Sequence, residues 1–386
     1  MTYDFDTIID RRGSGCFKYD ALNMMYGRDD LLSLWVADMD FAIAPEITQA
    51  LQERLQHPVL GYNLRLDPFY DALGHWMQSR FGWEIQREWV ISTPGIVPAI
   101  NLAILSLTQE QDGIVIQTPV YHPFYEAVTA NDRKLLTNPL LYDESGYHID
   151  WIDLEAKLRQ AKMFVLCSPH NPVGRVWTLE ELTRMGTLCR QYGVIILSDD
   201  IHADLVYSGS RHIPISSLED FADFTITCVS PSKSFNIAGL ATSVAIIPNP
   251  DIRARVNGLN FKLHLYLGNS FGITAFTAAY TKSEAWLDAL MIYLQANRDY
   301  LCDFIASRLP LLRINKPEST FLAWIDCSAL GLTDTELDDL ITNKARVALD
   351  TGPKFGVGGS GFMRLNFGCP RSILTEALER IEAAIK

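Results

Sequence analysis

The strongest constraint on the fold is the alternation of short apolar runs with amphipathic stretches between about residues 90 and 250. The runs are continuous and rich in β-branched residues, which is typical of strands buried on both faces. They are GIVIQ (113–117), MFVLC (163–167), VIILS (194–198), TITCVS (225–230) and SVAIIP (243–248). Helical patterns separate them, and the clearest opens with a capping box of Thr178 and Glu181. We therefore predict an α/β fold with a mostly parallel sheet flanked by helices.

The two ends of the chain differ from this middle. Residues 283–309 form a long helical pattern, and further helical stretches and isolated strands follow. A chain of 386 residues is also too long for one small core. We predict a large α/β domain over residues 45–285 and a smaller α+β domain made of residues 1–44 and 286–386.

Composition and charge exclude several classes of protein. The formal net charge of −13 argues against binding to nucleic acid or to anionic membranes. No apolar run approaches the roughly 18 residues of a spanning helix, and the first residues do not resemble a secretory signal. The seven cysteines are scattered without a C-x-x-C pair, so we expect free thiols in a reducing cytoplasm and no metal site.

Polar and aromatic residues follow the predicted strands, where ligands bind in sheets of this kind. Tyr121, Asn171, Asp199 and Lys233 come after the runs at 113–117, 163–167, 194–198 and 225–230. A Thr-Pro-Gly turn also opens a helix that starts with Gly95, Ile96 and Val97. Because the carboxyl ends of parallel strands share one edge of a sheet, we expect a single site there.

This set of residues fits pyridoxal 5′-phosphate (PLP). Lys233 can form a Schiff base with the cofactor aldehyde, and Asp199 can hold a proton on the ring nitrogen. Asn171 and His202 can donate to the ring oxygen, while Tyr121 offers a face for stacking. Gly95, Ile96 and Val97 can bind the phosphate through backbone N–H groups, together with the hydroxyls of Ser230 and Ser232. Taken singly, Lys233 could be a solvated lysine, Asp199 a helix cap and His202 a packed core histidine.

Eight segments in order resemble the fold type I PLP-dependent enzymes, the aspartate aminotransferase superfamily with its class I/II aminotransferases. Within it they resemble the cystathionine β-lyase-like C–S lyases. The segments are WVADMDF (35–41), GYN (61–63), TPGIVPAI (93–100), PVYHPFYEAV (119–128), SPHNPVGRVWTLEEL (168–182), SDDIHADLV (198–206), SPSKSFNIAGL (230–240) and FMRLNFGCP (362–370). The resemblance covers most of the chain and implies the PLP-dependent transferase fold type I.

The resemblance also implies roles beyond those read from the residues. Arg364 would bind the substrate α-carboxylate, with Asn171 and Tyr121 also at the substrate. Tyr62 would reach the phosphate bound by a partner subunit, so the active unit would be a homodimer with shared sites. Trp35 and Asp38 could line the substrate entrance, although core packing is the favoured interpretation.

Several positions depart from the family pattern. Asp200 stands where this branch usually carries Glu, and Ser234 where Thr is common. Ala241 stands where many aminotransferases carry a phosphate-binding Arg, which favours the lyase branch. Two other motifs do not fit their usual functions: GVGGSG (356–361) precedes a predicted strand, and GNSFG (268–272) has no His after its Ser.

Three functions are compatible with these residues. The leading hypothesis is a cytoplasmic PLP-dependent C–S β-lyase that converts cystathionine or another S-substituted cysteine to a thiol, pyruvate and ammonia. The second is an aminotransferase on the same cofactor, because both reactions begin with the same steps. The third is a regulatory or binding protein that uses this fold to hold a partner.

Overall fold

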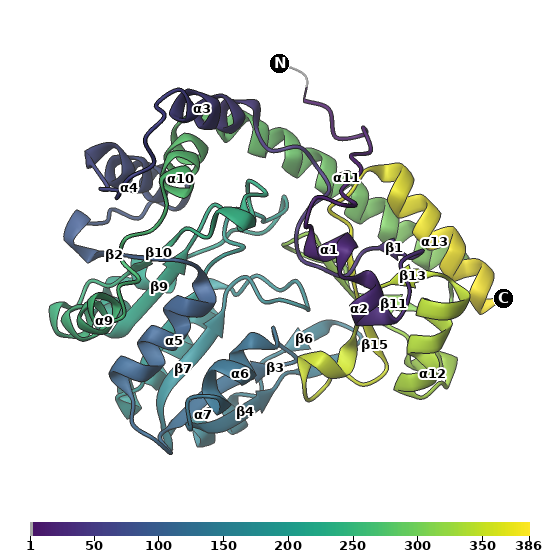
Figure 1. The fold of residues 1–386 in the computed structure, drawn as a ribbon. Helices are drawn as coiled ribbons and strands as arrows, with labels where there is room; N and C mark the ends of the chain where they lie inside the picture. Colours follow the sequence, from purple (N-terminus) through teal and green to yellow (C-terminus); the bar gives the residue numbers. More distant parts are fainter. Residues whose placement is uncertain (1–2) are drawn as a thin grey trace.

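The structure, a computed structural model, describes residues 3–386 and is built around a seven-stranded sheet (Figure 1). The strands lie in the order β2-β10-β9-β8-β7-β3-β4. Their bounds are β2 (Val90–Thr93), β3 (Gly113–Thr118), β4 (Lys134–Pro139), β7 (Ala161–Cys167), β8 (Ile195–Asp199), β9 (Thr225–Val229) and β10 (Ser243–Ile246). The five apolar runs of the sequence are five of these strands, which confirms that part of the prediction.

The sheet is parallel over most of its width and antiparallel at one edge. Strands β4, β3, β7, β8 and β9 run parallel to one another, whereas β10 is antiparallel to both β9 and β2. Residues 230–242 join β9 to β10 without a crossover α-helix, so the chain returns in the opposite direction. The sheet is mostly parallel, as predicted, and the exception is the connection that contains Lys233.

Helices cover both faces of this sheet. One face carries α5 (Ile96–Leu107), α6 (Pro123–Thr129) and α9 (Pro250–Lys262), and the other carries α7 (Trp151–Leu158) and α8 (Leu179–Tyr192). Beside β10, α3 (Pro45–Leu55) and α4 (Asp67–Phe81) pack on α10 (Ser270–Lys282). The predicted capping box of Thr178 and Glu181 is present at the start of α8. Continuous apolar strands are what a sheet covered on both faces requires.

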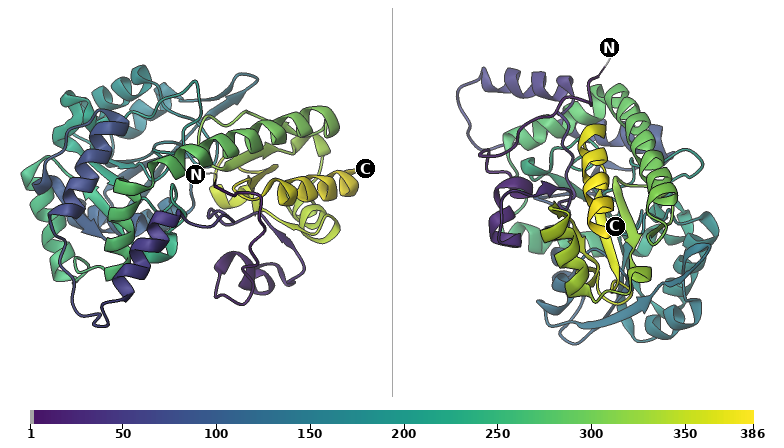
Figure 2. Two further views of the ribbon diagram at one scale, coloured as in Figure 1. Left: turned by 90° about the horizontal axis from the view of Figure 1, so that it is seen from above. Right: turned by 90° about the vertical axis from the view of Figure 1, so that its right-hand side faces the viewer.

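A second, four-stranded sheet has the order β11-β12-β15-β14. It consists of β11 (Arg313–Ile314), β12 (Leu322–Asp326), β14 (Asp350–Thr351) and β15 (Phe362–Asn366), accompanied by α11 (Glu284–Arg308), α12 (Asp334–Asp339) and α13 (Arg371–Ile385). Strand β1 (Leu32–Ser33) pairs with β13 (Val347–Ala348). This pairing keeps α1 (Phe17–Asp20) and α2 (Leu22–Tyr26) beside the C-terminal elements (Figure 2). A small hairpin of β5 (Leu141–Asp143) and β6 (Gly146–His148) completes the strands.

Element boundaries fall close to the predicted division of the chain. Helix α3 begins at Pro45 and α11 begins at Glu284, although the division into domains itself stays a prediction. Residues 356–361, the GVGGSG motif, form turns ahead of β15, which is the wrong context for a dinucleotide site. Across residues 3–386, every helix is too short or too polar to cross a bilayer.

Candidate active site

A buried cavity lies at the carboxyl ends of the parallel strands, at the edge where the sequence predicts a site. Its volume is about 210 Å³, and we call it the deep chamber. Nine predicted residues line it: Gly95, Ile96, Val97, Tyr121, Asn171, Asp199, His202, Ser232 and Lys233. They come from the start of α5 and from the ends of β3, β7, β8 and β9, so the strands bring together residues that are far apart in sequence.

A second cavity of about 610 Å³ lies next to the first, and we call it the outer chamber. Ala37, Tyr121 and Lys233 line both cavities. The remaining wall consists of Phe17, Met25, Trp35 and Val36 from the N-terminal segment, His122 and Glu126, and Asp350, Lys354 and Arg364. Lys233 therefore lies at the boundary between a smaller chamber and a larger one.

The Lys233 amine is buried at this boundary. Its Nζ donates a hydrogen bond to the backbone oxygen of Ala37 at 2.5 Å. Burial lowers the pKa of Lys233 to about 8, an effect that Asp38 opposes and Arg364 reinforces. A lysine with this pKa is neutral in an appreciable fraction of molecules near neutral pH, as a nucleophile or base must be.

Asp199 is the last residue of β8, between Cys167 of β7 and Cys228 of β9 in the register of the sheet. Its Oδ1 accepts a hydrogen bond from the N–H of Ile201 at 3.2 Å. Burial raises the pKa of Asp199 to about 7, and the neighbouring Asp200 adds to the rise. A buried carboxyl with so few donors is stable as an anion only beside a positive or N–H-bearing partner.

The start of α5 offers donors for an anion. Gly95 is the N-cap and supplies no side-chain cap, and the first turn contains no acidic residue. Pro98 has no N–H, so the free donors at this helix start are those of Ile96 and Val97. Free N–H groups at a helix start form a favourable place for a phosphate.

The two predicted phosphate serines differ in position. Ser232 lines the deep chamber, whereas Ser230 is absent from its wall. The Ser230 hydroxyl donates to the backbone oxygen of Thr242 at 2.8 Å and accepts from the N–H of Ser232 at 3.1 Å. Ser230 thus holds the Lys233 loop against the start of β10, a role the sequence did not suggest.

Tyr121, Asn171 and His202 occupy the chamber wall in different ways. Burial raises the pKa of Tyr121 to about 12, so its hydroxyl stays neutral. Burial lowers the pKa of His202 to about 3, with Lys233 and Arg364 adding to the fall, so its ring is neutral too. Within residues 3–386 the buried Nδ1 of His202 has no hydrogen-bond partner. A buried polar atom without a partner is costly, which is consistent with a bound ligand at this wall.

Arg364 is buried on β15 and faces the outer chamber. Its Nη2 donates to the backbone oxygen of Trp35 at 2.9 Å and pairs with Asp350, and its Nη1 donates to Oδ1 of Asn171 at 3.3 Å. Its guanidinium carbon lies 4.9 Å from the ring centroid of Phe355. The buried Nε finds no partner among the described residues, so the guanidinium retains donor capacity for a carboxylate.

Tyr62 is the one predicted site residue that lies fully at the surface of this single chain. Its side chain is 95% exposed, and it lines neither chamber. It lies in residues 58–66, which form neither helix nor strand between α3 and α4. One subunit alone therefore does not bring Tyr62 to the site.

Sequence reasoning missed most of the outer chamber. Core packing is the interpretation that the sequence favours for Trp35, yet this residue both packs in a small apolar cluster and lines the outer chamber. The backbone oxygen of Ala37 accepts the hydrogen bond of the Lys233 amine. Ala37 lies in the family segment WVADMDF (35–41), and its position in that segment is the one sequence signal for its role. Asp350 and Lys354 lie in no recognisable motif, so no local signal marks them.

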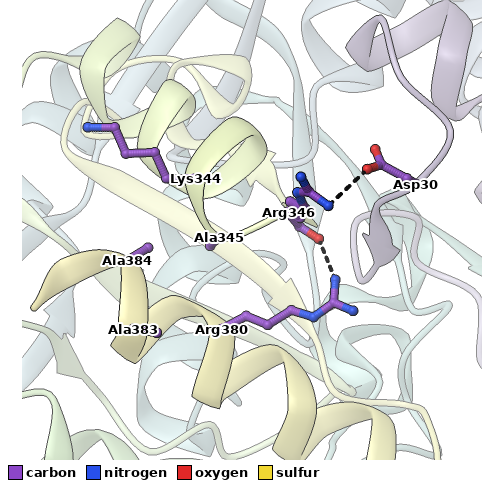
Figure 3. Close-up of a pocket in the computed structure, with 7 residues that line it drawn as sticks. All are labelled: Asp30, Lys344, Ala345, Arg346, Arg380, Ala383 and Ala384. Atoms are coloured by element: carbon purple, nitrogen blue, oxygen red, sulfur yellow. Dashed lines mark hydrogen bonds and ion pairs between the residues drawn. The ribbon is translucent and has the colours of Figure 1, made fainter.

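A further pocket lies away from these chambers (Figure 3). It is lined by Asp30, Lys344, Ala345, Arg346, Arg380, Ala383 and Ala384. Arg346 pairs with Asp30 at 3.5 Å, and Arg380 donates to the backbone oxygen of Arg346 at 3.2 Å while pairing with Glu376. Both arginines are thus engaged by protein groups, and the pocket contains no predicted site residue.

Comparison with known proteins identifies the family. The sequence model of aminotransferase class I and II matches residues 29–381. The chain belongs to the class I and II aminotransferase family. The chain is 43% identical over 385 residues to cystathionine β-lyase PatB of Bacillus subtilis (strain 168), and the match covers 99% of this chain and 100% of the relative.

Solved structures of the same family confirm the fold type. Cystalysin from Treponema denticola, which contains PLP, matches with a TM-score of 0.97 and 36% identity over 100% of this chain and 99% of cystalysin. A PLP-bound protein of Clostridium difficile 630, which carries the name of an aminotransferase, matches with a TM-score of 0.99 and 43% identity over 100% of both chains. The predicted family and the predicted fold type I architecture are thus confirmed.

The side chains of this aminotransferase-family site fit PLP. The deep chamber combines a lysine whose pKa is lowered to about 8 with a buried acid whose pKa is raised to about 7. It also contains the uncapped start of α5 and the unpartnered Nδ1 of His202. In the same order, these groups have the chemistry needed to bind the aldehyde, the ring nitrogen, the phosphate and the ring oxygen of the cofactor.

Proposed function

We propose that the protein is a PLP-dependent C–S β-lyase that converts cystathionine or another S-substituted cysteine to a thiol, pyruvate and ammonia. Lys233, Asp199 and the start of α5 would hold the cofactor in the deep chamber, with Asn171, His202, Tyr121 and Ser232 around its ring and phosphate. When bound, PLP supplies an aldehyde carbon that bonds an amine and a ring that accepts electrons from the substrate Cα. Cystathionine β-lyase is also the name of the B. subtilis relative.

Arg364 orients the substrate in this proposal. Its guanidinium binds the α-carboxylate through two N–H groups, while Asn171 and Asp350 fix the guanidinium plane. The S-substituent then extends into the outer chamber, which has about three times the volume of the deep one (610 against 210 Å³).

Lys233 moves the proton. With its amine free of the cofactor, Lys233 would remove the proton from the substrate Cα, and its pKa of about 8 suits a base near neutral pH. Asp199 would hold a proton on the ring nitrogen, because an anionic carboxylate in this buried place is stabilised by a cationic partner. Tyr121 and the apolar walls limit the access of water.

The observation that carries the proposal is the position of the Lys233 amine. It lies between the deep chamber, which Asp199 lines, and the outer chamber, which Arg364 lines. The test is the purified protein with added PLP and cystathionine. We expect a visible absorption band from bound cofactor and release of pyruvate with an equal amount of thiol. Absence of both the band and pyruvate would contradict the proposal.

Aminotransfer is the second candidate, favoured by the name of the C. difficile structure. Against it, Ala241 leaves this chain without the Arg that many aminotransferases carry at that position. The same substrate panel, assayed with and without a keto acid, separates the two. Amino transfer that greatly exceeds pyruvate release would favour the aminotransferase. A regulatory role as the main function would require a phenotype that survives Lys233→Ala.

We also propose that the active unit is a homodimer. Tyr62 is 95% exposed, and the same stretch exposes Val59, Leu60, Leu64 and Leu66 by 55% or more. A cluster of exposed apolar side chains favours a covered surface in the assembled protein. In the dimer Tyr62 would reach the partner's phosphate site. Light scattering should give twice the chain mass of 43.4 kDa, and Tyr62→Phe should weaken PLP binding without dissociating the dimer.

The cellular location and the domain division complete the proposal. The seven cysteines are free thiols, five of them buried, which supports residence in a reducing compartment such as the cytoplasm. The strand pairing of β1 with β13 supports assigning residues 1–44 to the smaller domain with residues 286–386. Proteolysis of the native protein that released residues 45–285 as a core would test that division.

A further inference from the structure

Two carboxylates follow one another at the end of β8 and face opposite sides of the sheet. Asp199 lines the deep chamber, whereas Asp200 is absent from its wall, and both residues are buried. The hydroxyl of Ser198 donates to Oδ1 of Asp200, as expected for residues two apart on one face of a strand. Since like charges disfavour ionisation, Asp200 adds to the rise in the pKa of Asp199.

His212 is the hydrogen-bond partner of Asp200. Its Nε2 lies 2.8 Å from Oδ2 of Asp200, and the side chains are 2% and 1% exposed. The edge of the His212 ring packs against Phe81 with 5.5 Å between ring centroids. Either protonation state of the ring can donate from Nε2. Ser198 and His212 thus supply the donors that a buried carboxylate requires.

The surroundings of both groups define what else could act on them. The charged and titratable groups near Asp199 are Asp200, Cys167 of β7, Cys228 of β9, Tyr121 after β3 and Lys233 after β9. His212 also interacts with the half-buried Asp204, which in turn accepts from Ser234 and Trp76 and interacts with Arg80. Among these groups, His212 is the ring that directly bonds the carboxylate adjacent to Asp199.

We propose that His212 and Asp200 form a positioning pair that sets the charge of Asp199 and thereby the strength with which this chain holds the ring nitrogen of PLP. The inference rests on the proposed cofactor. The Nε2–H of His212 offsets part of the negative charge of Asp200. Without this hydrogen bond, the Asp200 charge would act more strongly on Asp199, which would then keep its own proton to higher pH. A neutral, protonated Asp199 does not stabilise a protonated ring nitrogen, whereas the Asp199 anion does.

The test is a cycle of His212→Gln, Asp200→Asn and the double variant, measured as the affinity of the apoprotein for PLP between pH 6 and 9. We expect His212→Gln to bind PLP about fivefold more weakly near pH 7 and about tenfold more weakly near pH 6, as a rise of one unit in the pKa of Asp199 would produce. The loss should shrink as the pH rises, because Asp199 ionises there. The double variant, which lacks the Asp200 charge, should recover the affinity of Asp200→Asn.

A control variant and the dependence on pH decide the outcome. His75→Gln changes an exposed histidine of α4 and serves as the matched control, with affinity unchanged. A merely structural defect would lower the affinity equally at all pH values and would persist in the double variant, and either result overturns the inference. Wild-type affinity in His212→Gln would overturn it as well. Failure of the wild-type protein to bind PLP would instead overturn the proposed function.

Discussion

The deep and outer chambers meet at Lys233, yet they are built in different ways. The deep chamber collects residues that directly follow neighbouring strands of one sheet, so short motifs specify it. The outer chamber joins residues 17–37, 121–126 and 350–364, which meet through the pairing of β1 with β13, the pairing of β14 with β15 and the hydrogen bonds of Val120 and Tyr125 to the backbone oxygen of Phe355. The comparison indicates that local sequence specifies the deep chamber, whereas long-range packing specifies the outer chamber, where we propose that the substrate is selected.

The largest effect should come from the residue common to both chambers. Lys233→Ala removes the amine that holds the cofactor and moves the proton, and we expect pyruvate release to fall by about 10²- to 10⁴-fold or more. The matched control is Lys262→Ala, an exposed lysine at the end of α9. Near-normal pyruvate release by Lys233→Ala would remove the basis for treating the chambers as one active site.

The deep chamber should also control how the stability of the apoprotein depends on pH. Folding raises the pKa of Asp199 from 3.8 to about 7, so between these values the folded state binds one more proton than the unfolded state. The free energy of unfolding should therefore fall as the pH rises from about 4 to 7, by up to about 4 kcal/mol.

The same experiment has an internal contrast. Folding lowers the pKa of Lys233 from 10.5 to about 8, so stability should rise again between these two values. Urea denaturation of Asp199→Asn should lose the slope on the acid side and keep the slope on the alkaline side. Equal acid slopes in wild type and variant would show that Asp199 is not the group responsible.

Arg364→Lys tests the outer chamber. The charge is kept, but the planar pair of donors is lost, so we expect KM for cystathionine to rise about 10- to 100-fold with a smaller change in kcat. The affinity for PLP should remain close to that of the wild type, because Arg364 is absent from the wall of the deep chamber. If Arg364→Lys instead reduced the affinity for PLP and left KM unchanged, the assignment of substrate binding to the outer chamber would be wrong.

The smallest effect is expected at Lys354. It pairs with Asp350 at 3.1 Å, and its side chain is 38% exposed. Exposed ion pairs contribute at most about 1 kcal/mol, so Lys354→Met should change KM by no more than about fivefold. Kinetics with cystathionine and with S-methylcysteine would show whether the change depends on the size of the S-substituent. A change as large as that of Arg364→Lys would mean that Lys354 binds substrate directly.

Much of the fold and the deep chamber could be predicted because both depend on local patterns. Buried strands require continuous apolar runs, and their carboxyl ends meet at one edge, so Asn171, Asp199 and Lys233 could be placed together. The antiparallel direction of β10 could not be predicted, because an apolar run has the same pattern in a parallel and in an antiparallel strand. The role of Ser230 escaped it too, because a hydroxyl can bond either a ligand or a nearby backbone oxygen.

The outer chamber and Tyr62 mark the limit of such reasoning. Asp350 meets Arg364 across paired strands β14 and β15, and neither residue type indicates that contact in sequence. Tyr62 is predicted from the family resemblance alone, and its exposed position in the single chain leaves it away from both chambers. In the sequence Asp200 stands out only as a departure from the family pattern, because its partner His212 lies twelve residues further along the chain.

The most direct test of the account is a mass measurement. The protein is saturated with PLP, reduced with borohydride to fix the cofactor on the amine that holds it, digested, and analysed by peptide mass spectrometry. The account predicts one modified peptide, with the added mass of the reduced cofactor on Lys233. A modification spread over exposed lysines, with Lys233 unmodified, would contradict it.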